Sequence, residues 1–224
     1  MTILDAAFFD RDACIVAKDL LGKVLRRRWQ DRWLACRIIE TEAYYRREKA
    51  SHSSLGYTEK RKAMFMPPGT IYMYDARGGD SLNVSVRGVG NAVLIKAGVP
   101  WFDDLSPQAN LHIMQRLNPI RGSGRLRPAE RLCAGQTLLC RSLGLKVKDW
   151  DQRPFDPQAF RVEDVGHPVH EIIQTTRLGI PPGRDGHLMY RFIDQSAARH
   201  ATRNPLTRRG AIEGRDYRIV RRRG

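Results

Sequence analysis

Hydrophobic and polar residues alternate with two different periods along this chain, and the period distinguishes helices from strands. Apolar residues recur at helical spacing from residue 10 to residue 21 and stop before Gly22, which predicts a helix that ends there. Apolar or alternating runs bounded by polar turns predict strands over residues 24–28, 33–44, 70–74, 82–86 and 92–96.

The second half of the chain mixes short helical and extended patterns. Ser106 and Pro107 predict a capped helix start, with the helix running to about Leu117, and two shorter helices are expected over residues 128–135 and 136–143. Apolar segments over residues 169–175, 187–193 and 217–220 alternate with loops rich in Pro and Gly. Since no repeat or clear linker divides the chain, we predict a single α+β domain, with a curved mixed or antiparallel sheet flanked by helices.

Charge narrows the possible partners. The chain of 224 residues has 39 Lys and Arg against 24 Asp and Glu, a formal net charge of +15. Most of the cations are Arg, whose planar fork suits phosphate, and they cluster over residues 26–28, 60–62, 116–131 and 199–223. We interpret them as a nucleic-acid surface. A merely solubilising surface is the first alternative, and an anionic membrane surface is the second, because no basic amphipathic helix accompanies the clusters.

Other bulk features favour a cytoplasmic protein without a metal or other cofactor. No apolar run approaches the roughly 18 residues of a membrane span, and the first residues do not resemble a secretory signal. The four cysteines form no Cys-x-x-Cys pair, so we expect reduced thiols and no zinc site. His167 and His170 are separated by Pro168 and have no evident third ligand. We expect a monomer.

The candidate catalytic and binding residues lie between Arg37 and Lys96. On a strand over residues 38–44, Glu40, Glu42 and Tyr44 share one face, because side chains at i and i+2 point the same way. An amphipathic strand with its polar face in water is the alternative interpretation. The nearby residues His52, Tyr72, Tyr74 and Asn83 favour a site. A carboxylate beside flat stacking surfaces, in a basic chain, indicates an enzyme that acts on a base of a polyanion.

Three blocks of this region resemble the alkyladenine DNA glycosylase family, also called methylpurine or 3-methyladenine DNA glycosylases of the mammalian type. The blocks are ETEAY at residues 40–44, His52-Ser53, and MFMPPGTIYMY at residues 64–74. Residues 20–25 and 131–140 are also similar to family motifs, and the resemblance extends from about residue 5 to about residue 195.

The resemblance implies a monofunctional glycosylase that acts on double-stranded DNA in base excision repair, without a cofactor. Such an enzyme flips an alkylated purine, such as 3-methyladenine or 7-methylguanine, out of the duplex and hydrolyses its N-glycosidic bond. By the same match, Glu42 is the general base that activates water and stabilises positive charge at the sugar. Tyr44, His52 and Tyr74 form the pocket for the base. Asn83 screens purines by clashing with the guanine amino group.

Two departures from the family pattern affect the expected DNA contacts. Lys96 stands where the family usually has Arg, and it would bind phosphate or help to hold the catalytic water. Family members also carry an apolar hairpin whose Tyr wedges into the duplex, whereas residues 75–82 hold no aromatic side chain. Gly78 and Gly79 suit a tight turn there, and Arg77 is the nearest candidate wedge, so we assign these three residues to DNA binding.

Similarity fades after residue 193. We therefore divide the chain into a glycosylase domain over residues 1–195 and a basic C-terminal extension over residues 196–224. The extension is either an additional phosphate-binding tail or a disordered segment. Two other function classes stay open: a non-catalytic nucleic-acid-binding module, which leaves the acid unexplained, and a small-molecule hydrolase, which leaves the charge unexplained.

Overall fold

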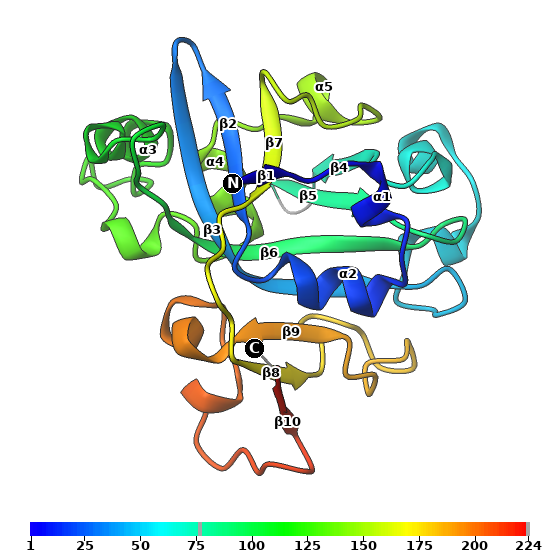
Figure 1. Ribbon diagram of the computed structural model, residues 1–224. Helices are drawn as coiled ribbons and strands as arrows, with labels where there is room; N and C mark the ends of the chain where they lie inside the picture. Colours follow the sequence, from blue (N-terminus) through cyan, green and yellow to red (C-terminus); the bar gives the residue numbers. More distant parts are fainter. Residues whose placement is uncertain (76–77, 223–224) are drawn as a thin grey trace.

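A single antiparallel sheet organises the molecule. The computed structural model describes residues 1–75 and 78–222, and these form ten strands with helices packed around them (Figure 1). The main path of the sheet has the order β1-β7-β2-β3-β6-β5-β4, and β9, β8 and β10 continue from β3 as a side branch. The expected α+β class with a sheet flanked by helices is confirmed, and every strand pair in the described residues is antiparallel.

The strands agree with the sequence pattern in most places. Their bounds are β1 Thr2–Ile3, β2 Val24–Trp29, β3 Arg32–Tyr44, β4 Ile71–Asp75, β5 Asp80–Ser85, β6 Ala92–Pro100, β7 Phe160–Asp164, β8 Glu171–Thr175, β9 Arg191–Asp194 and β10 Tyr217–Arg221. The strands β1 and β7 lie where the sequence analysis placed no element.

The helices are short. The α-helices are α1 Ala6–Phe9, α2 Ala13–Leu20, α3 Leu111–Leu117, α4 Gln136–Ser142 and α5 Val147–Trp150. Single turns of tighter 3₁₀ type, or a little more, are η1 His52–Leu55, η2 Glu59–Phe65, η3 Gln108–Asn110, η4 Ala129–Arg131, η5 Gln195–His200 and η6 Pro205–Thr207.

Helix α2 shows how local sequence and packing cooperate. The Asp12 side chain accepts hydrogen bonds from the first backbone N–H groups of the helix, and Gly22, at φ +83°, allows the chain to turn away after its end. The helix packs on β3 and β6, burying Val16 and Leu20 in the main core. This core also receives Leu139 from α4, while a smaller core under the side branch packs β9 against η5.

Strand β3 passes from one set of neighbours to another along its length. It pairs with β2 up to Arg37, and over residues 40–42 it lies hydrogen-bonded between β6 and β9. A strand with partners on both sides resists local opening more than an edge strand. The backbone of residues 40–42 is therefore held firmly, and so are the positions of their side chains.

A helical turn begins just after Pro107, but Ser106 does not cap it as expected. The Ser106 hydroxyl accepts a hydrogen bond from the buried guanidinium of Arg26 at 2.8 Å, and the first turn after Pro107 has no side-chain cap. The Ser106 hydroxyl therefore binds the distant Arg26 side chain instead of the backbone N–H groups of the helix, to which the local pattern assigned it. The helix expected over residues 128–135 is reduced to the single turn η4.

Residues 196–222 contain all but the first residue of η5, together with η6 and β10, and β10 pairs with β8 along its whole length. Figure 1 shows this segment in orange and red beside β8 and β9. Within residues 1–75 and 78–222, no helix is long and apolar enough to cross a membrane.

Candidate functional site

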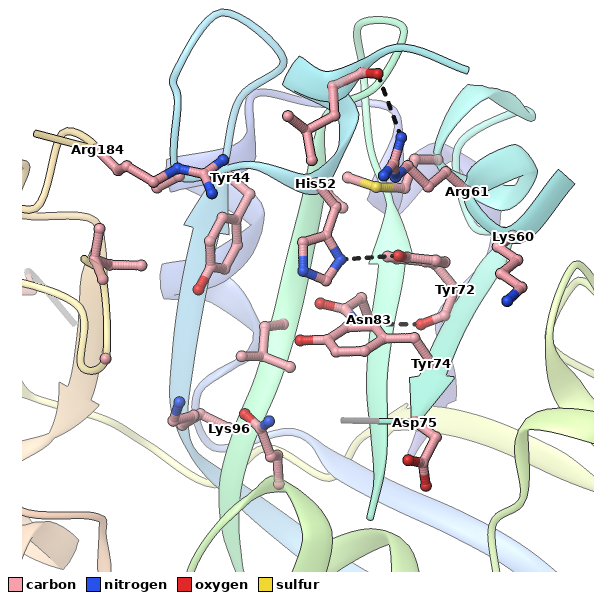
Figure 2. Close-up of a pocket in the computed structure, with 18 of the residues that line it drawn as sticks. Tyr44, His52, Lys60, Arg61, Tyr72, Tyr74, Asp75, Asn83, Lys96 and Arg184 are labelled. Carbon is pink, nitrogen blue, oxygen red and sulfur yellow. Dashed lines mark hydrogen bonds between the residues drawn. The ribbon is translucent and has the colours of Figure 1, made fainter. Parts of the chain in front are cut away.

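A cavity of about 970 Å³ opens beside strands β3, β4, β5 and β6. Figure 2 shows aromatic side chains facing one another across it, with cationic side chains around them. The lining residues that the sequence analysis assigned to substrate binding are Tyr44, His52, Tyr74, Asn83 and Lys96. Residues from five separate segments of the chain thus meet in one concave site, as binding sites for small organic groups require.

Glu42 lies fully buried immediately behind the cavity wall. Its Oε2 accepts a hydrogen bond from the Tyr44 hydroxyl at 2.6 Å, and its Oε1 lies 3.4 Å from Lys96 Nζ. Oε1 has no hydrogen-bond partner among the described residues. A buried carboxylate oxygen without a donor is costly, so this oxygen is suited to accept a hydrogen bond from a water or another molecule that enters.

The Tyr44 hydroxyl is a fixed donor. Burial, and then the neighbouring Glu42 carboxylate, raise the pKa of Tyr44 well above its usual value, so the phenol keeps its proton at neutral pH. The guanidinium of Arg177 lies 4.5 Å from the centre of the Tyr44 ring, and Arg177 in turn pairs with the buried Glu48. The contact with Arg177 on the ring and the hydrogen bond of the hydroxyl to Glu42 therefore leave the orientation of the Tyr44 ring little freedom.

His52 and two tyrosines form the opposite aromatic wall. His52 Nδ1 lies 3.0 Å from the Tyr72 hydroxyl, and its ring meets the Tyr74 ring edge-on with centroids 4.6 Å apart. Burial, with the nearby cations Arg61 and Arg184, lowers the pKa of His52 below its usual value. The imidazole is therefore neutral at pH 7, and it presents an uncharged ring to the cavity.

Asn83 is held by the strand opposite. It pairs in register with Tyr72, and its amide nitrogen donates to the Tyr72 backbone carbonyl at 3.2 Å. This bond uses one of the two amide N–H donors and leaves the side-chain oxygen and the second N–H to meet a ligand. The side chain is buried and lines the cavity, so it restricts which edge of a planar ligand can fit.

Lys96 owes its position to an irregularity of the sheet. The register between β3 and β6 shifts on either side of Glu40, so that Ala97 lies opposite Glu40 while Ile95 lies opposite Thr41. Lys96 is the extra residue in this bulge. Bulges redirect side chains, and this one brings the Lys96 ammonium to the Glu42 carboxylate at the cavity.

The second carboxylate of the strand serves a different partner. Glu40 is fully buried and pairs with Arg191 Nε at 2.6 Å, and it also accepts hydrogen bonds from the backbone N–H and hydroxyl of Thr202. Neither carboxylate is among the described residues that line the cavity, but the partners of Glu42, Tyr44 and Lys96, line it, whereas those of Glu40 do not. The two acids of the motif are thus compensated by separate cations, Arg191 for Glu40 and Lys96 for Glu42.

The three residues assigned to DNA binding lie at the β4–β5 hairpin. Arg77 lies outside the described residues. Gly78 has φ +75°, the left-handed conformation that a tight turn needs and that glycine adopts readily. Gly79 packs against Thr137 of α4. The hairpin borders the cavity through Asp75, the last residue of β4.

Several cavity residues were not in the expected set. The sequence analysis named Tyr72 beside Tyr74 on the same strand but did not assign it to the pocket. Gln136 and Thr137 lie on α4, and Arg61 lies in the cationic cluster of residues 60–62, but neither pattern assigned them to the site. Leu178, Ile180, Pro181 and Arg184 come from a loop without a periodic signal. The segment from residue 178 to residue 184 forms one side of the cavity, although it follows β8 in an irregular loop.

The chain is similar in sequence to proteins of one known family. Residues 7–198 match the sequence profile of the family described as methylpurine-DNA glycosylase. A protein of Pseudomonas savastanoi pv. phaseolicola named "Putative 3-methyladenine DNA glycosylase" is 65% identical over 210 residues, which cover 94% of this chain and 93% of that protein. A protein of Pseudomonas aeruginosa with the same name is 61% identical over 217 residues, covering 97% and 90%. The mouse protein named "DNA-3-methyladenine glycosylase" is 41% identical over 157 residues, covering 67% of this chain and 45% of the mouse protein.

Proposed function

Because the chain belongs to the methylpurine-DNA glycosylase family, we propose that it is a DNA-3-methyladenine glycosylase that hydrolyses the N-glycosidic bond of alkylated purines in DNA repair. The observation that supports this most strongly is the buried Glu42 carboxylate behind an aromatic cavity. One of its oxygens is bound by Tyr44, and the other has no hydrogen-bond donor in the part of the chain that the structure describes. A binding module has no need for such a group, whose burial costs stability.

Glu42 is the general base of the reaction in this proposal. The bond from the sugar carbon to the purine nitrogen breaks, and its electron pair leaves with the cationic purine, which departs as the neutral base. A water that donates to Oε1 attacks the sugar carbon and gives its proton to the carboxylate, whose negative charge stabilises the oxocarbenium-like transition state before the proton arrives. The Tyr44 hydroxyl fixes the carboxylate by its bond to Oε2. The carboxylate therefore needs little reorganisation during the reaction.

The flipped base lies between Tyr44 on one side and His52 with Tyr74 on the other. Methylated purines such as 3-methyladenine and 7-methylguanine are cationic and electron-poor, so they stack well on neutral aromatic faces. The neutral His52 is part of this selectivity, because an imidazolium would repel the same cation. Asn83 disfavours guanine by a clash with its amino group. 7-Methylguanine keeps that amino group, so in this proposal it is excised in spite of the clash, because its bond to the sugar is already weak.

Lys96 contributes in two ways. Its ammonium stabilises the ionised Glu42 at 3.4 Å, and it has further N–H donors for the water or for a phosphate oxygen. Lysine lacks the planar fork of arginine, so it positions either ligand less firmly. We therefore propose efficient excision of cationic methylpurines, whose bond to the sugar is already weak, and weak excision of hypoxanthine and 1,N6-ethenoadenine.

The substrate in this proposal is duplex DNA, bound by a monomer. The positive surface attracts the phosphates, and Lys60, Arg61 and Arg184 provide cations at the cavity itself. The hairpin at Gly78 and Gly79 occupies the space that the flipped base vacates. Flipping costs a few kcal/mol, least where the lesion pairs badly.

The test is base release from a duplex that carries 3-methyladenine or 7-methylguanine. The protein should release the free base and leave an intact abasic strand that breaks only on alkali or heat. Borohydride should trap no covalent protein–DNA adduct, because water is the nucleophile and not a lysine. A protein that binds the duplex but releases no base would favour the alternative of a non-catalytic nucleic-acid-binding module.

A further inference from the structure

Helix α4 connects the base cavity to the β4–β5 hairpin. Gln136 and Thr137, in the first turn of α4, line the cavity, and Asp75 lines it from the hairpin side. The same turn of α4 also contacts the other strand of the hairpin, β5, through the hydrogen bond from Gln136 to Ser81. The distance between hairpin and cavity is therefore set by how β5 packs on α4.

The closest part of this packing is the contact between Gly79 and Thr137. A Cβ atom added to Gly79 would lie 2.2 Å from Thr137 Cγ2 and 2.5 Å from Thr137 Oγ1. Gly78 has a left-handed backbone, whereas Gly79 does not, so the turn itself does not require glycine at residue 79. Glycine is required there because the threonine side chain already occupies the space of a Cβ.

Polar contacts on both sides of Gly79 hold the same arrangement. Arg141 Nη2 donates to the Gly78 carbonyl at 2.9 Å, and Gln136 Nε2 donates to the Ser81 hydroxyl at 2.9 Å. Ser81 is fully buried, so its bond to Gln136 is shielded from water. These bonds join α4 to the residue before Gly79 and to the second residue after it, and together they restrict sliding of the hairpin along the helix.

We propose that Thr137 is a positioning residue that fixes the hairpin, through Gly79, at the distance from the cavity at which a flipped purine is kept out of the duplex. This inference rests on the proposed function, because it assumes that a base leaves the duplex and enters the cavity. The hairpin holds the vacated space only if its backbone is correctly placed. A displacement of about 1 Å remote from the reacting atoms can cost about 10²-fold in rate.

The test compares Gly79→Ala with the rescue double variant Gly79→Ala/Thr137→Gly, which removes the opposing side chain. Gly186→Ala is the matched control, because a Cβ there would lie 3.6 Å from Ile180 and its backbone is not left-handed. Single-turnover rates are measured on two duplexes with one 7-methylguanine, placed opposite cytosine or opposite an abasic-site analogue. Thermal unfolding of each variant reports on folding.

We expect Gly79→Ala to lower the rate on the paired lesion by about 10²-fold and to lower it much less on the lesion opposite the abasic site, where flipping costs less. The double variant should recover most of the loss, and Gly186→Ala should match the wild type. An unchanged rate, an equal loss on both duplexes or no recovery in the double variant would overturn the proposal. Failure of the wild type to release base from either duplex would instead refute the proposed function.

Discussion

The bond between Tyr44 and Glu42 can be removed without disturbing the aromatic wall. Tyr44→Phe keeps the ring and deletes the hydroxyl that donates to Glu42 Oε2 at 2.6 Å. A hydrogen bond to a charged group contributes about 1.5–3 kcal/mol. If this free energy is lost from the orientation of the carboxylate in the transition state, excision should slow by about 10- to 150-fold, since about 1.4 kcal/mol corresponds to a factor of ten.

The assay is single-turnover release of 7-methylguanine with enzyme in excess, together with a binding measurement on the same duplex. Tyr45→Phe is the matched control, because the Tyr45 hydroxyl also donates to a carboxylate, Asp12 Oδ2 at 2.8 Å, but outside the cavity. The rate should fall in Tyr44→Phe alone, while duplex binding stays near the wild-type value in both variants.

Two results would refute this reasoning. Equal rates in Tyr44→Phe and the wild type would mean that the hydroxyl does not orient the catalytic carboxylate. Equal losses of rate in Tyr44→Phe and Tyr45→Phe would mean that a general disturbance of the fold, rather than loss of the bond to Glu42, slows excision.

Three further predictions follow from the charges. Duplex binding should weaken steeply with salt, with a log–log slope of about −0.9 per neutralised phosphate, and a flat response would remove the support that the charge of +15 gives to DNA binding. Lys96→Arg should raise the single-turnover rate on hypoxanthine more than on 7-methylguanine, and an equal change on both would show that positioning by the lysine does not limit neutral lesions. Arg191→Met should lower the free energy of unfolding in urea by about 3–5 kcal/mol, because it leaves Glu40 buried without its cation. Arg221→Met, which breaks the exposed pair with Glu171, should lower it by less than about 1 kcal/mol, and similar losses in both would contradict the importance of burial.

The sequence alone predicted the parts of the site that depend on local periodicity. The strand period placed Glu42 and Tyr44 on one face, and the structure joins them by a hydrogen bond within β3. The class of the fold followed for the same reason, because alternating strands separated by short turns pair as antiparallel neighbours. Tyr74 and Asn83 likewise lie on paired strands of one hairpin.

Contacts between distant segments had no such signal. Glu40 has the same local pattern as Glu42, yet its partner Arg191 lies 151 residues later in the chain and takes Glu40 away from the cavity. The bulge that directs Lys96 toward Glu42 depends on the register of two strands, and register is a property of the assembled sheet. The same holds for Gly79, whose requirement for glycine arises from Thr137 on another element.

The most direct test of the account is to compare Glu42→Gln with the wild type in excision and in duplex binding on the same alkylated DNA. The substitution is isosteric and keeps an oxygen for the Tyr44 hydroxyl, but it removes the base. We expect excision to fall by at least about 10²–10⁴-fold while the affinity for the duplex is retained. Near-wild-type excision by Glu42→Gln would contradict the assignment of Glu42 as the general base.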